Sequence, residues 1–212
     1  MKKSERIVWS QAVIDTALNN TDIQKQLAKM GLTKEQLLGG KALVEEVLRL
    51  EAIQSKELGD RFDATDELNT IRDQAKELFA KHVADARHAL RNQRGHWEAL
   101  GLDGKRKNDL FEWVAQADKF YNNIAPVLPL LKKYSISETE VSEARALIVR
   151  VMDAYNARNK EASEAKTATQ QRNIALEALD AWMKRFTQTA KLAFADAPEY
   201  LEILGIKKKK TA

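Results

Sequence analysis

The stretch Glu98-Ala99-Leu100-Gly101-Leu102 returns 104 positions later as Glu202-Ile203-Leu204-Gly205-Ile206. Compared at this offset without gaps, residues 1–108 and 105–212 share 19 identical pairs out of 108, against about 7 expected by chance. Self-similarity at a fixed period is the mark of a duplicated structural unit. We therefore predict two tandem helical repeats, 1–104 and 105–206, packed as one elongated domain and followed by a disordered basic tail at 207–212.

Both Leu-Gly stretches have the pattern of a short helix that ends at a left-handed glycine. An apolar residue follows each glycine and is expected to fold back onto the last helical turn. The alternative is a docking element for a partner. We favour the structural interpretation, because a duplicated cap requires only duplicated packing.

The composition is that of a protein with its own apolar core. The chain has 212 residues, 44% of them hydrophobic, and no cysteine. This excludes a disulfide scaffold, thiol catalysis and cysteine zinc sites, and it fits a reducing, cytoplasmic location. The start Met1-Lys2-Lys3 is followed by charged residues instead of an apolar segment, and no apolar run approaches the ~18 residues of a membrane span. We predict a soluble protein that is neither exported by a signal peptide nor membrane-spanning.

Apolar residues recur at helical spacing, and hairpin signals are nearly absent, which predicts an all-α fold. The first segment of each repeat has an N-cap residue followed by an acid, at Ser4 and at Asn108. It restarts at a capping box that begins at Thr21 in the first repeat, and at Pro126 in the second. In the first repeat this predicts two helices, at about 5–19 and 22–30.

Two further capping boxes in register, Thr33-x-x-Gln36 and Ser137-x-x-Glu140, predict the start of a long helix in each repeat. Gly39-Gly40 weakens the first copy. Aligned cap-like residues near 63 and 167 predict turns at about 61–64 and 165–168, so that each repeat holds a long antiparallel hairpin. The alternative is one continuous helix through 34–90. The hairpin interpretation gives an up-and-down four-helix bundle with polar tips, in which a pseudo-two-fold axis relates the two repeats.

Candidate catalytic and metal residues are few. His82, Asp85 and His88 suggest a metal site, but there is one weak half-motif and no second copy, so we predict surface polar residues, no metal and no cofactor. The sequence contains no phosphate loop, nucleophile elbow or His-Glu-x-x-His motif. We therefore predict that the protein is not an enzyme.

The net charge of +4 is concentrated in two short clusters, Lys105-Arg106-Lys107 and a C-terminal run of four lysines. We expect the first cluster to be an exposed, tethered linker between the repeats. The run of four would provide only weak, non-specific contacts to nucleic acid or other anions, since no aromatic residue accompanies it. Its members are Lys207, Lys208, Lys209 and Lys210.

Trp182 and Phe186 are the candidate pocket residues. At helical spacing they are expected to be core, but their counterparts in the first repeat, Leu78 and His82, are smaller or polar. The two halves would then pack unequally, which predicts a cavity for an apolar ligand at this place.

Three functions remain open from the sequence. The first is a non-catalytic scaffold or protein-interaction module that uses its hairpin tips or its base, with an unknown protein partner or a second copy of the chain. The alternatives are a binder of a small apolar ligand, and weak nucleic-acid binding by the lysine tail.

Overall fold

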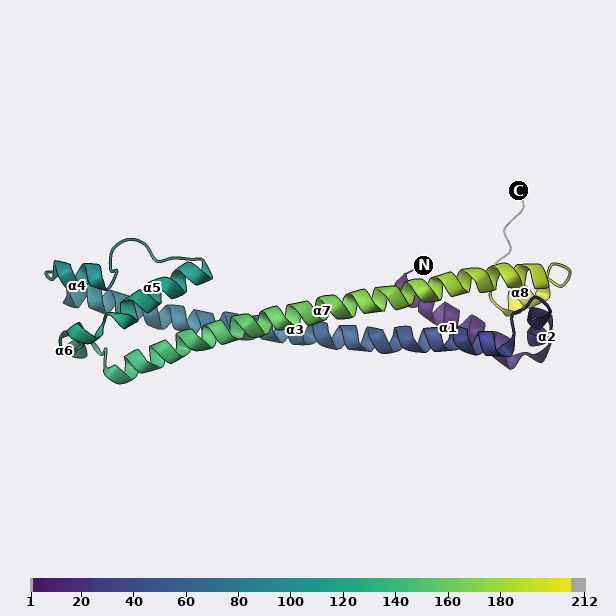
Figure 1. Ribbon diagram of the computed structural model, residues 1–212, viewed down its shortest axis with the longest axis horizontal. Helices are drawn as coiled ribbons and strands as arrows, with labels where there is room; N and C mark the ends of the chain where they lie inside the picture. The colour runs from purple at the N-terminus through teal and green to yellow at the C-terminus, as the bar shows by residue number, and fades with distance from the viewer. Residues whose placement is uncertain (1, 207–212) are drawn as a thin grey trace. The chain divides into compact units, whose positions relative to one another are not determined.

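The computed structural model describes residues 2–206, and all regular structure in this range is helical (Figure 1). This confirms the predicted all-α class. In chain order the elements are α1 (Lys3–Asn19), α2 (Thr21–Lys29), α3 (Lys34–Ala89), α4 (Arg94–Ala99), α5 (Leu110–Asn122), η1 (Ala125–Val127), α6 (Leu128–Leu131), η2 (Lys132–Tyr134), α7 (Glu138–Ala193) and α8 (Glu199–Ile203).

The predicted hairpin turns at 61–64 and 165–168 are wrong, because both stretches lie inside continuous helices, α3 and α7. Neither stretch contains glycine or proline. The hydroxyls of Thr65 and Thr169 each donate to the carbonyl oxygen four residues earlier, at 2.8 Å. These two threonines lie two residues after the predicted caps, Asp63 and Thr167, and bond back inside a continuous helix. The alternative stated for the first repeat, one continuous helix through 34–90, is what forms there, and α7 is continuous in the same way, so the hairpin tips do not exist.

The starts of α3 and α7 follow the predicted capping boxes. At α7 the backbone N–H of Ser137 donates to Glu140 Oε2 at 2.8 Å, and the Glu140 N–H donates to Ser137 Oγ at 3.2 Å. At α3 the Thr33 N–H donates to Gln36 Oε1 at 3.3 Å. Both helices have 56 residues. α3 begins at residue 34 and α7 begins 104 positions later, at residue 138.

The caps of the shorter helices are displaced from their predicted positions. Asn20, and not Thr21, caps α2, and its side chain accepts two backbone N–H bonds of 3.1 Å. Asp109, and not Asn108, caps α5 in the same way, at 3.0 and 3.2 Å. Ser4 lies inside α1. Asn and Asp reach the second and third amides of a helix, so each of these two is a competent cap.

The two Leu-Gly stretches end α4 and α8 as predicted. Gly101 has φ +62° and Gly205 has φ +67°, both left-handed. The Leu102 N–H donates to the carbonyl oxygen of Trp97 at 3.1 Å, and the Ile206 N–H donates to that of Leu201 at 2.8 Å. The side chains of Leu102 and Ile206 are buried. This is the predicted glycine-ended turn with an apolar residue folded back on it.

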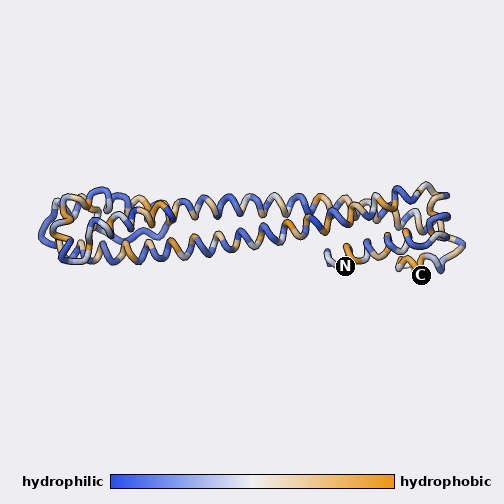
Figure 2. Tube along the Cα trace, turned by 90° about the horizontal axis from the view of Figure 1, so that it is seen from below, coloured by the Kyte–Doolittle hydropathy of each residue, from blue (hydrophilic) through white to orange (hydrophobic). Residues whose placement is uncertain are grey.

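The described residues fall into two compact units. Unit 1 takes its residues from Met1–Leu58 and Glu164–Ala212, and unit 2 is Gly59–Ser163. Unit 1 contains α1, α2, the first part of α3, the last part of α7, and α8; unit 2 contains the last part of α3, α4 to α6, and the first part of α7. Along the helices of each unit, hydrophobic and hydrophilic positions alternate (Figure 2), as expected of helices with one buried face.

Each unit has its own apolar core. The core of unit 2 is rich in aromatic rings, because Phe79 of α3 packs against Trp113, Phe120 and Tyr121 of α5, with centroids 5.6 to 6.2 Å apart. Leu48 of α3 lies outside these cores and is 43% exposed. The core of unit 1 is mainly aliphatic and comprises Ile7, Val13, Ile14, Ala17, Ile23, Leu27, Leu37, Val44, Val47, Leu176, Leu179, Met183, Phe186, Ala190, Phe194, Leu201, Leu204 and Ile206.

Candidate functional site

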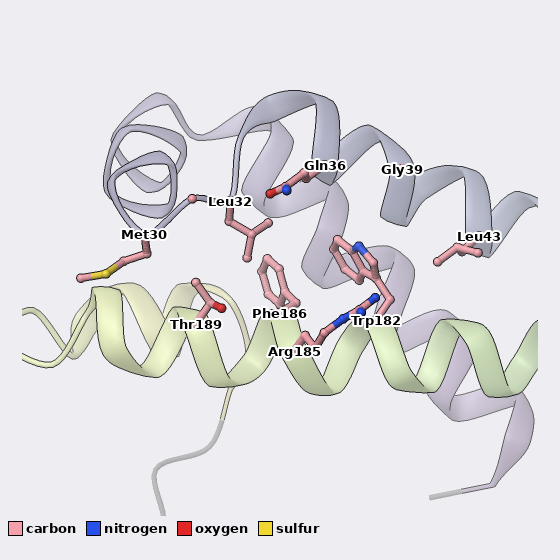
Figure 3. A pocket seen from close by; sticks show the side chains of 10 residues that line it. Met30, Leu32, Gln36, Gly39, Leu43, Trp182, Arg185, Phe186 and Thr189 are labelled. Carbon is pink, nitrogen blue, oxygen red and sulfur yellow. The ribbon is translucent and has the colours of Figure 1, made fainter.

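Unit 1 contains an open cavity of about 650 Å³ between the start of α3 and the last turns of α7 (Figure 3). Both residues predicted to line a ligand pocket, Trp182 and Phe186, line this cavity. We call it the Trp182 recess. Its lining residues are Met30, Gly31, Leu32, Gln36, Gly39, Leu43, Trp182, Arg185, Phe186 and Thr189.

The position of the Trp182 ring depends on a glycine in α3. A Cβ atom at Gly40 would overlap the six-membered ring of Trp182, so the indole lies directly on the helix backbone there. The same ring stacks on Phe186, with centroids 5.4 Å apart and planes 16° from parallel. Phe186 is buried and Trp182 is half-buried. The two rings therefore form a fixed aromatic wall with one accessible side.

The neighbouring glycine keeps the recess open. A Cβ atom at Gly39 would meet no atom within 4 Å, in contrast to one at Gly40. The two glycines are consecutive but have different surroundings. Gly39 faces free space, and Gly40 faces the Trp182 ring. In the sequence alone, this pair of glycines indicates only a weak point in a helix.

Among residues 2–206, Arg185 is the only ionisable residue that lines the recess. Its side chain is exposed and runs beside Trp182 (Figure 3). It forms no hydrogen bond or ion pair with any residue in the described range 2–206. The other polar groups of the lining, Gln36 and Thr189, are uncharged. The recess therefore combines apolar walls with one available cation.

The corresponding positions of unit 2, taken 104 residues away along the chain, are charged. Glu140, Glu143 and Asp85 correspond to Gln36, Gly39 and Thr189, and Lys81 corresponds to Arg185. In unit 2 two of these charged groups act on their surroundings. Burial is the main cause that lowers the pKa of His82, while the negative charge of Glu140 raises it and the positive charge of Lys81 lowers it. The hydrogen bond from Ser137 is the main cause that lowers the pKa of Glu140, and Lys81 lowers it further. At these positions unit 1 has a cation and none of the three acids.

His82 is not the surface residue that the sequence analysis predicted. It is 0% exposed, and its Nδ1 lies 3.0 Å from the hydroxyl of Tyr121. Its Nε2 has no partner in the described part of the chain. Burial is the main cause that lowers the pKa of His82, and burial likewise raises the pKa of Tyr121. A signal for this burial was present, since the residue 104 positions after His82 is Phe186.

The three residues of the metal hypothesis do not converge. His82 is bonded to Tyr121, while the ring of His88 packs edge-on against Tyr134 with centroids 5.5 Å apart. The set His82, Asp85 and His88 does not place three ligand atoms within reach of one ion. The buried His82–Tyr121 pair is closed to solvent, so it serves packing in unit 2.

Unit 2 has a smaller cavity of about 350 Å³ at the basic cluster after α4. It is lined by Lys76, Arg106, Lys107, Asn108 and Trp113. The Lys76 amine lies 5.9 Å from the Trp113 ring centroid and donates to the Asn108 carbonyl oxygen at 3.3 Å. The Lys107 amine pairs with the neighbouring helix residue Glu112 at 3.6 Å. Two of its amines thus already have partners. Lys207, Lys208, Lys209 and Lys210 lie outside the described residues.

No protein-family model matches the chain, and no curated protein or solved structure matches it. Among the helices of residues 2–206, none has both the length and the apolar character needed to cross a bilayer.

Proposed function

We propose that this protein is a non-catalytic helical module, built by tandem duplication of a 104-residue unit, that works by binding other molecules. In this proposal the duplicated helices are the scaffold, and the Trp182 recess of unit 1 is the binding site. The predicted pseudo-two-fold axis stays a prediction.

Three local features support the duplication. The two 56-residue helices begin and end 104 positions apart. Both Leu-Gly stretches make the same left-handed turn with the same pair of backbone hydrogen bonds. Thr65 and Thr169, which are also 104 apart, bond back into their helices in the same way. Independent segments would have no reason to repeat such details at one spacing.

The difference between corresponding positions around the recess carries the binding proposal. Folding requires neither an open space beside Gly39 nor an unpaired arginine at its edge. Unit 2 shows that the same backbone elements accommodate acids at these positions. An apolar cavity with a few polar groups is the usual form of a ligand site, and about 650 Å³ lies within the range of such sites.

The experiment compares two glycine variants of the full chain, Gly39→Leu and Gly59→Leu. Both positions are exposed, lie inside α3, and have nothing within 4 Å of an added Cβ, but only Gly39 lines the recess. Both substitutions improve helix propensity, so neither is expected to unfold α3.

The readout is native mass spectrometry of each protein as purified, followed by the same sample denatured. We expect wild type and Gly59→Leu to keep a defined non-covalent mass, a ligand or a further subunit, that Gly39→Leu has lost. Identical spectra for all three proteins would contradict binding at the recess.

A second candidate function is protein interaction through unit 2. Phe111 of α5 is 52% exposed although it packs edge-on against Tyr155 of α7, with ring centroids 5.2 Å apart. Tyr155 is half-buried, and an exposed aromatic ring that packs on such a neighbour is a common anchor at protein interfaces. Light scattering as a function of concentration tests it, with Phe111→Ser as the variant and Phe62→Ser, another exposed phenylalanine of unit 2, as the control. Self-association that Phe111→Ser alone removes would support this surface.

A further inference from the structure

We propose that the Trp182 recess binds a small organic acid: a molecule with a flat or extended apolar body and a single anionic group. This rests on the proposed function, since it names the ligand class of the same site. The body lies against the aromatic wall, and the anionic group pairs with Arg185.

The apolar part of the proposal follows from the walls. Trp182 and Phe186 present a stacked pair of rings on one side, and Leu32 and Leu43 come from the other side. Figure 3 shows Leu32 directed toward Phe186, and Met30 at the edge of the opening. The rings are fixed before any ligand arrives, because the backbone at Gly40 holds Trp182 and the core holds Phe186. A preformed wall reduces the entropy lost when a ligand binds.

The anionic part follows from the charge balance. Arg185 lines the recess without a protein partner in the described range, and no acid lines it. A cation would meet only the like charge of Arg185, and an uncharged molecule would leave Arg185 hydrated. The guanidinium offers donors in a fork that matches a carboxylate. One available cation fits one anionic group.

The replacement of three acids argues the same way. A duplicated unit inherits both signs of charge, and here only the cation persists around the opening of unit 1. An acid at position 36, 39 or 189 would pair with Arg185 or repel an incoming anion. In unit 2, where Glu140, Glu143 and Asp85 are present, the same position would not accept an anion.

Isothermal titration calorimetry of the full chain tests the inference with three probes. They are 2-naphthoate, its uncharged analogue 2-naphthamide, and decanoate, which has an extended body. We expect at least one of the two acids to bind saturably, and naphthoate to bind about fivefold more tightly than naphthamide, as expected for one exposed charge pair.

Matched variants assign this binding to the recess. Arg185→Gln should remove the preference for the acid, and Lys184→Gln, which removes an adjacent exposed charge outside the lining, should keep it. Gly39→Leu should abolish binding of the acids, and Gly59→Leu should leave it unchanged. Equal affinities for naphthoate and naphthamide, or equal effects within either pair of variants, would overturn the inference.

Failure of this inference can be told apart from failure of the proposed function. If neither acid binds up to about 1 mM, the organic-acid inference is wrong. If Gly39→Leu nevertheless loses a non-covalent mass in native spectra, the recess is still a binding site and that mass identifies another class of occupant. If both experiments show no difference, both proposals are wrong.

Discussion

Unit 1 and unit 2 divide side-chain volume differently between corresponding pairs of positions. In unit 1 the Trp182 ring of α7 lies on Gly40 of α3, whereas unit 2 has Leu78 and Ala144 at these positions. The next pair differs in a similar way, with Phe186 and Ala17 in the core of unit 1, and His82 bonded to Tyr121 in unit 2.

This comparison separates what the backbone requires from what it tolerates. The glycine turns and the starts of the long helices agree in both halves of the chain, since they satisfy backbone groups that must be paired. The core side chains, in contrast, differ between the two units, because a core tolerates different residues as long as their combined volume fills the same space. The Trp182 recess lies where the side chains of unit 1 leave space beside Gly39. The differences between corresponding positions therefore predict which substitutions each unit tolerates.

The largest expected difference between the units lies in the aromatic cluster of unit 2. Phe79→Ala should lower the free energy of unfolding by about 3–5 kcal/mol, because it leaves a cavity and removes contacts to three rings. Met183→Ala, the corresponding change in the aliphatic core of unit 1, should cost less. Urea unfolding followed by circular dichroism measures both losses. An equal or larger loss for Met183→Ala would show that the rings of unit 2 add nothing beyond volume.

The next effect concerns the glycine under Trp182. Gly40→Ala should destabilise the protein by about 1–3 kcal/mol, because the added methyl group displaces the indole, and this exceeds the helix-propensity gain. Adding Trp182→Leu reproduces the Ala144 and Leu78 combination of unit 2 and should recover about 1–2 kcal/mol of that loss. A double-mutant cycle from urea unfolding gives the coupling. Additive effects of the two substitutions would mean that the ring and the glycine are independent.

The His82–Tyr121 pair should make stability depend on pH. Burial lowers the pKa of folded His82 below its ordinary value of 6.5, so between that value and the lowered one the unfolded chain binds a proton that the folded chain does not. Stability should therefore be full above pH 6.5 and fall as the pH drops, by up to about 1.4 kcal/mol per pH unit, until the lowered pKa is reached.

The control for this dependence is a pair of variants measured across the same pH range. The double variant His82→Phe with Tyr121→Phe removes both polar groups together, so neither is left buried without a partner, and it should remove the pH dependence from this window. His88→Gln removes an exposed histidine and should leave it in place. A slope that persists in the double variant would assign the dependence to another group.

Prediction from sequence succeeded where the signal was local and failed where two arrangements satisfied the same groups. The capping box at Ser137 and the glycine at 101 specify backbone hydrogen bonds within a few residues, and both predictions hold. A threonine hydroxyl, in contrast, can cap a new helix or bond back to the carbonyl four residues earlier. Thr65 and Thr169, two residues after the predicted caps Asp63 and Thr167, do the latter, and α3 and α7 continue through both predicted turns.

The candidate site was predicted in part for a similar reason. Trp182 and Phe186 could be identified because the residue 104 positions before each of them is smaller. The opposite wall, with Gln36 and Gly39, lies more than 140 positions away in the sequence. Local propensity treats Gly39-Gly40 as helix-weakening, and only the folded arrangement shows which glycine supports a ring and which leaves a space.

The smallest expected effect is at Gly39 and Gly59, where an added Cβ meets free space, in contrast to Gly40, where it meets the Trp182 ring. Gly39→Ala and Gly59→Ala should each stabilise the protein by about 0.5–1 kcal/mol, because alanine suits a helix interior and nothing lies within 4 Å of the new methyl group. Thermal or urea unfolding should therefore give Gly39→Ala and Gly40→Ala opposite signs, although the residues are adjacent. If Gly39→Ala instead destabilises the protein, a side chain of the protein occupies that space in solution. The recess would then be closed, and its use as a binding site would require that side chain to move.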